Sequence, residues 1–247
     1  MKRIALSGLV MLLVALLPLP VAAAEGDYER SYVILINGEP AGSEIVRETA
    51  GADGTLTSVS EHEIVLTDGI EANRVAYTAR TVFSAAREPV SYHFQYTSGA
   101  SGDSFEVSVA DGQVTRVLTR SGQTSEVSVP IPPDMVIFDF NVYHLADAVA
   151  ARYDTKKGGR QTFANFIPVV GADLPLEVTA TGTGRLKTPA GDLDVRNFRF
   201  DMSGIWTGNI TVDGVNRLVR LDIPARNLEV VRADLMPGAA PAQPSVP

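Results

Sequence analysis

Cysteine is absent from this chain of 247 residues, and tryptophan (one) and histidine (three) are scarce. Without a thiol the protein can form no disulfide, no thiolate nucleophile, no thiolate metal site and no lipid anchor on cysteine. The fold must therefore be stable through its core alone.

Long apolar runs are also missing, apart from one at the amino terminus. Two basic residues precede the apolar run Ile4–Leu17, which ends at Pro18. A transmembrane helix needs about 20 apolar residues, so this run is too short to be retained in a membrane. The small residues Ala22–Ala24 before Glu25 complete the pattern of a secretory signal peptide. We predict that residues 1–24 are removed at Ala24-Glu25, that the mature protein is periplasmic, and that it has no transmembrane segment.

Positive charge is sparse as well. The formal net charge of −8 becomes −10 once the two basic residues of the signal peptide are removed. The other basic residues are scattered, and Lys156–Arg160 is their one concentrated group. Such a surface repels phosphate backbones and anionic lipid headgroups, so we predict no nucleic-acid partner and no electrostatic docking to membranes.

The mature chain is rich in alternating apolar and polar residues. In the segment 90–97, Val90, Tyr92, Phe94 and Tyr96 alternate with polar residues, which predicts one covered strand face. Turn dipeptides of the Asn-Gly and Asp-Gly type separate such segments. The predicted strands are 28–37, 41–49, 55–67, 70–83, 90–98, 103–110, 113–119, 123–129, 161–168, 175–182, 192–201, 204–212 and 216–232. So many antiparallel strands cannot form one flat sheet. We predict an all-β fold with minor α content: a single strongly curved antiparallel meander of about ten to thirteen strands, forming a half-barrel or a near-closed barrel.

One helix is predicted to plug the open side of this sheet. Prolines at 130–133 end the first group of strands, and Asn141 is a suitable N-cap for a helix over 142–152. Its apolar stripe consists of Val142, Leu145, Ala146, Val149 and Ala150. We predict one β-rich domain over 25–236, with this helix and loop inserted at about 130–160, and a flexible tail over 237–247. A domain boundary at 130–160 is the alternative.

The three histidines are the candidates for acid–base or metal chemistry. Strand alternation sends His62 to the face opposite Glu61 and Glu63, so these three cannot share a metal ion, and a solvated face is predicted for His62. His93 is likewise predicted to be exposed.

His144 stands near Asp139, Asn141 and Asp147 at the start of the predicted helix, at an exposed helix position. Helix starts favour carboxylates and caps without any catalytic role. The sequence contains no phosphate loop, no nucleophile elbow and no zinc-site spacing. We therefore predict a protein that is not an enzyme, with no cofactor and no metal site.

Two family resemblances are present. Gly204-Ile205-Trp206 resembles the Gly-x-Trp signature of lipocalins, but it stands late in the chain, so Trp206 equally fits a core position. The runs 184–198, 205–206 and 217–224 resemble the last strands of uncharacterised bacterial periplasmic β-rich proteins, and 32–42 is similar to their first hairpin. Their half-barrel organisation is similar in outline to the periplasmic lipoprotein carriers. The resemblance implies a fold and a compartment, and it supplies no active site.

Aromatic residues suggest where a ligand would bind. The candidate ligand-binding residues are Tyr77, Phe83, Tyr92, Phe94, Tyr96, Phe105 and Trp206. Rings on a curved sheet can line a pocket, with phenol hydroxyls as polar anchors, or they can simply form the core. The leading hypothesis is an exported, non-catalytic binding or carrier-like protein that holds an apolar or amphipathic ligand, such as a lipid, within the sheet. The alternative is an envelope structural or assembly factor that acts through a protein partner, using the tail and the loop Lys156–Arg160.

Overall fold

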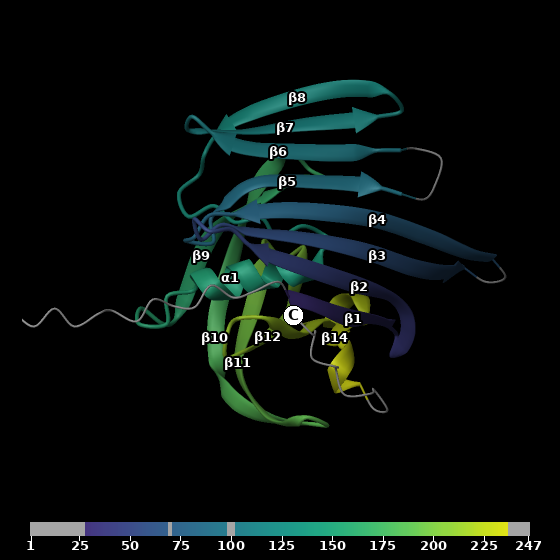
Figure 1. Cartoon of the computed structure of the whole chain (residues 1–247), viewed down its shortest axis with the longest axis vertical. Helices are drawn as coiled ribbons and strands as arrows, with labels where there is room; N and C mark the ends of the chain where they lie inside the picture. Colours follow the sequence, from purple (N-terminus) through teal and green to yellow (C-terminus); the bar gives the residue numbers. More distant parts are fainter. Residues whose placement is uncertain (1–27, 69–70, 98–101, 237–247) are drawn as a thin grey trace, which may run out of the picture.

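The computed structural model describes residues 28–68, 71–97 and 102–236 (Figure 1). The predicted signal peptide, its predicted cleavage site and the predicted tail 237–247 lie outside the described residues. Within these ranges, no helix has the length and apolar character needed to cross a membrane.

In the described part of the chain, fourteen antiparallel strands form one sheet that curves strongly without closing, which confirms the predicted fold class (Figure 1). The strands are β1 (Tyr28–Ile36), β2 (Glu39–Ala50), β3 (Leu56–Asp68), β4 (Glu71–Phe83), β5 (Pro89–Tyr96), β6 (Ser104–Ala110), β7 (Gln113–Arg120), β8 (Gln123–Pro130), β9 (Arg160–Ile167), β10 (Ala172–Thr188), β11 (Gly191–Met202), β12 (Trp206–Asp213), β13 (Leu218–Ile223) and β14 (Leu228–Arg232). Their order is β8-β7-β6-β5-β4-β3-β2-β1-β14-β13-β12-β11-β10-β9. Two meanders are thus joined by the pairing of β1 with β14, in which Tyr32 lies opposite Arg232.

Two predicted boundaries differ from the structure. The predicted strand 216–232 is two strands, because the short 3-10 helix Pro224–Arg226 and the left-handed residue Asn227 (φ 48°) reverse the chain. The predicted strand 175–182 does not end at Gly182: Gly182 occupies a β-bulge at φ 138°, and β10 continues to Thr188. Glycine permits that backbone conformation without ending the ladder.

A second bulge, on β5, changes the direction in which one side chain of the strand points. Val82 lies opposite Ser91 and Phe83 lies opposite Pro89, so Val90 is the extra residue. Tyr92 and Phe94 face the core as predicted, whereas Val90 is 41% exposed. The prediction for Val90 was wrong because one inserted residue reverses the alternation of side chains.

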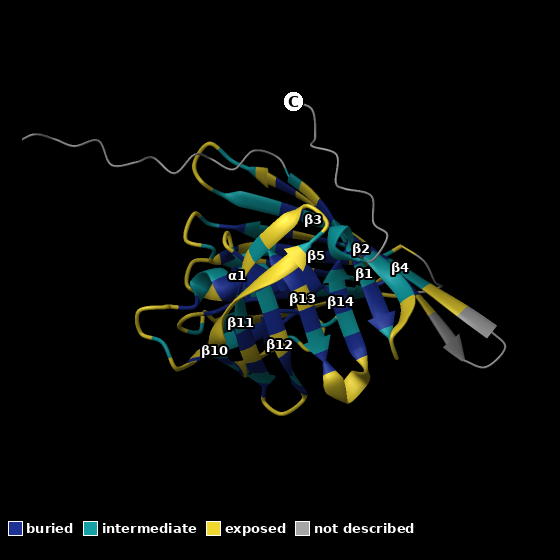
Figure 2. Cartoon of the chain, turned by 90° about the horizontal axis from the view of Figure 1, so that it is seen from below, coloured by how far each residue is buried: buried dark blue, intermediate teal, exposed yellow. Residues whose placement is uncertain are grey.

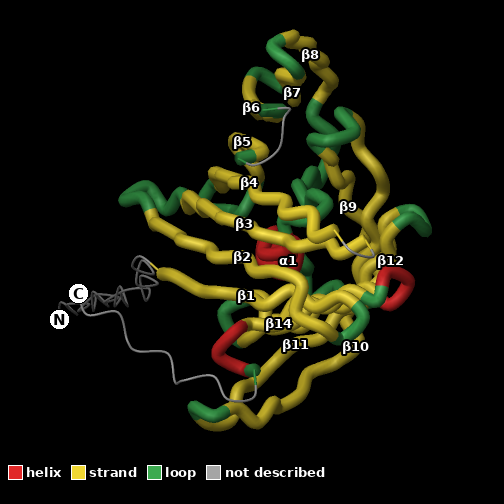
Figure 3. The backbone as a smooth tube through the Cα atoms, turned by 90° about the vertical axis from the view of Figure 1, so that its right-hand side faces the viewer, coloured by secondary structure: helices red, strands yellow, loops and turns green. Residues whose placement is uncertain are grey.

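The inside of the curve is filled by the segment between β8 and β9. Residues 135–138 are buried, and they lead into a 3-10 helix (Tyr143–Leu145) and helix α1 (Ala146–Arg152), which lies inside the curved sheet (Figure 3). We call residues 135–152 the plug. The predicted apolar stripe is buried, but Asn141 is not an N-cap: it adopts φ 68°, and neither helix start has a side-chain cap.

The plug also links the two ends of the sheet. Val136 forms a parallel bridge with Asn165 on β9, and the Asn165 side chain exchanges hydrogen bonds with the backbone of Phe138. On β7, the guanidinium of Arg116 donates to the carbonyl of Pro168, which follows β9. The ends are therefore joined by the plug and by one side chain rather than by a strand ladder. Burial alternates along β11 to β14, as expected for strands with one covered face (Figure 2).

Candidate functional site: a polar network beneath helix α1 and the cleft beside it

Five of the predicted ligand-binding residues lie on the neighbouring strands β4 to β6, and we call them the aromatic row: Tyr77, Tyr92, Phe94, Tyr96 and Phe105. This row is part of the core. Tyr77, Tyr92, Phe94 and Phe105 are buried in one cluster with residues of the plug, and Tyr96 is half-buried against it. The Phe94 ring contacts those of Tyr77, Tyr96 and Phe105, with centroids 5.0 Å apart for Tyr77 and Phe94. The row is therefore covered by the chain itself.

The plug also takes up the phenol hydroxyls. Tyr77 donates to the carbonyl of Asn141 at 2.7 Å, and Tyr92 donates to the carboxylate of Asp139 at 2.7 Å. Burial raises the pKa of Asp139 to about 6, although Tyr92 and the amide of Phe140 oppose this rise through hydrogen bonds. The hydroxyls predicted as ligand anchors are thus anchors for the plug.

The other two predicted site residues, Phe83 and Trp206, belong to the same buried cluster. Trp206 is buried against Phe140, with ring centroids 4.5 Å apart. Phe83 also lines a cleft beside helix α1.

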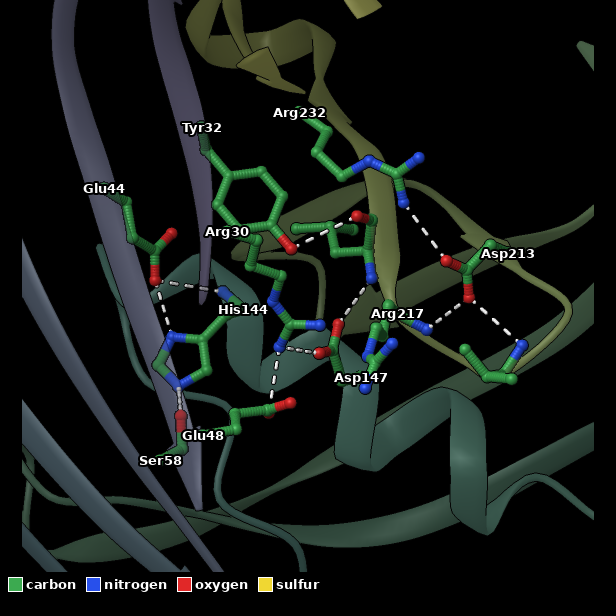
Figure 4. A network of polar contacts seen from close by, with 12 residues as sticks. Arg30, Tyr32, Glu44, Glu48, Ser58, His144, Asp147, Asp213, Arg217 and Arg232 are labelled. Atoms are coloured by element: carbon green, nitrogen blue, oxygen red, sulfur yellow. Dashed lines mark hydrogen bonds and ion pairs between the residues drawn. The ribbon is translucent and has the colours of Figure 1, made fainter. Parts of the chain in front are cut away.

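Buried charged and polar side chains of β1, β2 and β3 form a network with side chains of the plug (Figure 4). His144 is 2% exposed, and its Nδ1 atom lies 2.5 Å from Oε1 of Glu44. The amide of His144 also donates to that carboxylate at 3.3 Å. Burial opposes the charge of Glu44, but His62 and His144 outweigh it and hold the pKa of Glu44 below its ordinary value. A buried carboxylate on β2 thus holds the start of the plug helix.

His62 belongs to the same group, and its prediction was wrong. It is 3% exposed rather than solvated, because the plug covers the face of β3 that carries it. Its ring stacks on Tyr77, and its Nε2 atom lies 2.8 Å from the Ser60 hydroxyl and 3.6 Å from Glu44. Burial lowers the pKa of His62 to about 4, so this side chain is neutral at pH 7. His93, by contrast, lies on the outer face with a 40% exposed side chain, in agreement with its prediction.

Ser58, His144 and Glu44 have the hydrogen-bond order of an acyl-transfer triad. The Ser58 hydroxyl lies 2.8 Å from Nε2 of His144, whose Nδ1 contacts Glu44 (Figure 4). A nucleophile must also reach its substrate. The Ser58 residue is 0% exposed beneath the plug and does not line the cleft. In this conformation the three residues anchor the plug.

A second group continues the network along β1. Arg30 is buried between two carboxylates: its Nη2 atom lies 2.9 Å from Glu48 on β2 and forms an ion pair with Asp147 on α1. Burial raises the pKa of Asp147 to about 6, against the charge of Arg30. Arg30 therefore connects two strands and the helix.

The hairpin between β12 and β13 closes the network. Asp147 accepts a hydrogen bond from the Leu218 amide at 2.6 Å, and the Tyr32 hydroxyl donates to the Leu218 carbonyl at 3.1 Å. Asp213 accepts from the amides of Val215 and Arg217 and pairs with Arg232 at 3.1 Å (Figure 4). The hairpin is thus held against the first turn of α1, which contains Asp147.

A cleft of about 60 Å³ lies between this hairpin, α1 and the adjoining ends of β2 to β4. Its polar lining includes the buried His144 and Glu48, together with Asp147, Arg87 and Arg217. Its apolar lining includes Leu56, Phe83 and Val215. Such a volume accepts a few water molecules or one end of a ligand, and is smaller than a pocket for a whole drug-sized molecule.

Within the described ranges, no set of three or more His, Asp or Glu side chains has an arrangement that could hold a metal ion.

Sequence reasoning missed most of this network, although a signal was present. Arg30 alternates with Tyr32 and Ile34, and Glu44 and Glu48 flank Val46, all on covered faces. A charged residue that shares the face of buried apolar residues is the signature of a buried ion pair. The predictions instead grouped His62 and His144 with the carboxylates nearest to them in the sequence.

The fold and the cleft define a class: an open, β-barrel-like sheet that encloses its own plug. No family model matches the chain, and no curated protein matches it. Its structure is similar to the crystal structure of a beta-barrel-like protein of domain of unknown function DUF1849 from Brucella abortus. The TM-score is 0.55 at 9% identity, covering 84% of this chain and 95% of the other. The similarity supports a barrel-like fold, and it points neither to a catalytic family nor to the lipoprotein carriers in particular.

Proposed function

We propose that this chain is an exported, periplasmic, non-catalytic binding protein that holds an apolar or amphipathic small molecule at the cleft beside α1. One observation carries the proposal: buried charged groups and apolar side chains converge on the same opening of an otherwise filled sheet. Convergent polar groups beside an apolar wall are typical of ligand sites. The signal peptide predicted over residues 1–24 supports the compartment.

The location of the ligand differs from the sequence-based hypothesis. The aromatic row is covered by the plug, so the ligand contacts the mouth of the sheet, where Phe83 is the one member of the predicted set that lines the cleft. The inaccessibility of Ser58 supports the absence of catalysis.

Filling the cleft tests this function. Ala151 lines the cleft on α1, and Ala172 is an exposed residue of β10 outside it. Ala151→Phe should abolish uptake of the neutral apolar dye N-phenyl-1-naphthylamine and of any ligand seen by native mass spectrometry, whereas Ala172→Phe should leave both unchanged. Thermal unfolding of both variants checks that they are folded. A wild-type protein that takes up neither dye nor ligand would overturn the proposal.

A second candidate function, binding of a protein partner, is favoured by the free edge of the sheet. The other edge strand, β9, is partly covered by Val136, whereas β8 pairs with β7 and with no other described strand. Nearly all of β8 is exposed, its pairing with β7 has no register shift, and Glu126 is its single charge. Natural edge strands are usually protected by bulges, charges or covering segments. An extended segment of a partner can therefore add to β8 as a further strand.

The hairpin geometry identifies the backbone group to change. Ser121 and Gly122 form a two-residue turn with positive φ, so Arg120 and Gln123 form a hydrogen-bonded pair and the amide of Glu126 points away from β7. Glu126→Pro removes this donor, whereas Glu126→Gln removes only the charge. Loss of a stoichiometric co-purifying envelope protein in Glu126→Pro alone would support strand addition. Retention of that protein in both variants would contradict it.

A further inference from the structure

We infer that the cleft beside α1 recognises the carboxylate head of an amphipathic acid, with the guanidinium of Arg87 as the principal contact. This inference rests on the proposed binding function and specifies its ligand chemistry. The inference is based on a comparison of the charged groups of the cleft, some of which are already paired within the protein.

The acidic groups of the cleft are paired internally. Glu48 and Asp147 both contact the buried guanidinium of Arg30, and Asp147 also accepts the Leu218 amide. His144, which also lines the cleft, uses both ring nitrogens to contact Glu44 and Ser58. These groups have little capacity left for a cationic or neutral ligand.

The basic groups that line the cleft are Arg217 and Arg87. Arg217 lies over the Tyr28 ring, with its guanidinium carbon 3.7 Å from the ring centroid, and still lines the cleft. Arg87 also lines the cleft, and among the described residues its guanidinium has no ion pair or side-chain hydrogen bond. Both carboxylates of the lining are already paired with Arg30, so the guanidinium of Arg87 keeps its donors for a ligand. An anionic head group satisfies these donors.

Shape restricts the ligand further. The cleft volume of about 60 Å³ accommodates a head group, and the exposed Val215 and the neighbouring Leu56 offer apolar surface at its opening. A planar carboxylate matches the fork of donors on a guanidinium. The attached alkyl chain would then lie along Leu56, Phe83 and Val215.

The test compares an acid with the alcohol of the same length. The full chain is expressed, and the exported protein is purified, delipidated and titrated with dodecanoate or 1-dodecanol below their aggregation limits. Arg87→Gln is compared with Arg80→Gln, which removes an exposed arginine from β4 outside the cleft. Gln retains a β-carbon at the left-handed position of residue 87 (φ 61°), so backbone strain is unchanged. Arg87→Lys retains the charge without the fork of donors.

The expected result is tighter binding of dodecanoate than of dodecanol, by about tenfold or more. Arg87→Gln should remove this preference, Arg87→Lys should keep part of it, and Arg80→Gln should keep it all. Equal binding of acid and alcohol, or an unchanged preference in Arg87→Gln, would overturn carboxylate recognition and leave the proposed binding function intact. If neither compound nor the neutral dye binds, both proposals are wrong.

Discussion

Replacement of Asp139 by asparagine should change how stability depends on pH. Asp139 is buried beneath the aromatic row, where it accepts hydrogen bonds from the Tyr92 hydroxyl and the Phe140 amide. Burial raises its pKa from 3.8 to about 6. The native state therefore holds this proton more tightly than the unfolded chain does. The resulting stability is fully present below about pH 4 and is lost as the pH rises through about 6.

The rise in pKa corresponds to about 3 kcal/mol of unfolding free energy. Asparagine has the same shape, can accept the Phe140 amide and carries no charge at any pH. The stability of Asp139→Asn relative to wild type should therefore increase by about 2.4 kcal/mol between pH 4 and pH 8. Asp147 is present in both proteins, so its contribution to the pH dependence of stability cancels in the difference between them.

Urea unfolding measured at intervals between pH 4 and pH 8 provides the assay. Asp192→Asn, at an exposed position of β11, is the matched control and should show a constant difference from wild type. A constant difference for Asp139→Asn as well would refute the reasoning, because it would mean that Asp139 has the same proton affinity in the folded and unfolded states.

Three further predictions concern the network and the core. His144→Ala should destabilise the protein by about 3 kcal/mol or more, because it removes the nearest side-chain partner of the buried Glu44; adding Glu44→Gln should restore part of this loss in urea unfolding. A fluorophosphonate probe should not label Ser58, and labelling that disappears in Ser58→Ala would contradict a purely structural role for this residue. Phe105→Ala should cost about 3 kcal/mol or more if the aromatic row is core, and a loss below about 1 kcal/mol would indicate that the ring faces a ligand space.

Local sequence patterns were sufficient to predict most of the strands. Turn dipeptides and period-two alternation are properties of neighbouring residues, so the strand faces of Tyr92 and Phe94 and the buried stripe of the plug follow from the sequence. The same reasoning failed at Val90 and at Gly182, where a bulge inserts one residue into the ladder. A bulge depends on the partner strand as well as on its own residues.

The candidate site could not be predicted in the same way. His144 and Glu44 are 100 positions apart, and Arg30 meets Asp147 only because the plug folds back against β1 and β2. Alternation shows that Arg30 and Glu44 share faces with apolar residues, but it does not show what covers those faces. His62 was predicted to be solvated for this reason.

By itself, the sequence determined an all-β, strongly curved antiparallel sheet without disulfides, because composition and periodicity act over a few residues. The tertiary structure alone decided the joining of the two meanders through β1 and β14, the burial of His62 and His144 and the position of the cleft. These features depend on contacts between segments that are distant in the chain. Such contacts form only when burial of the plug compensates for the entropy of closing long loops.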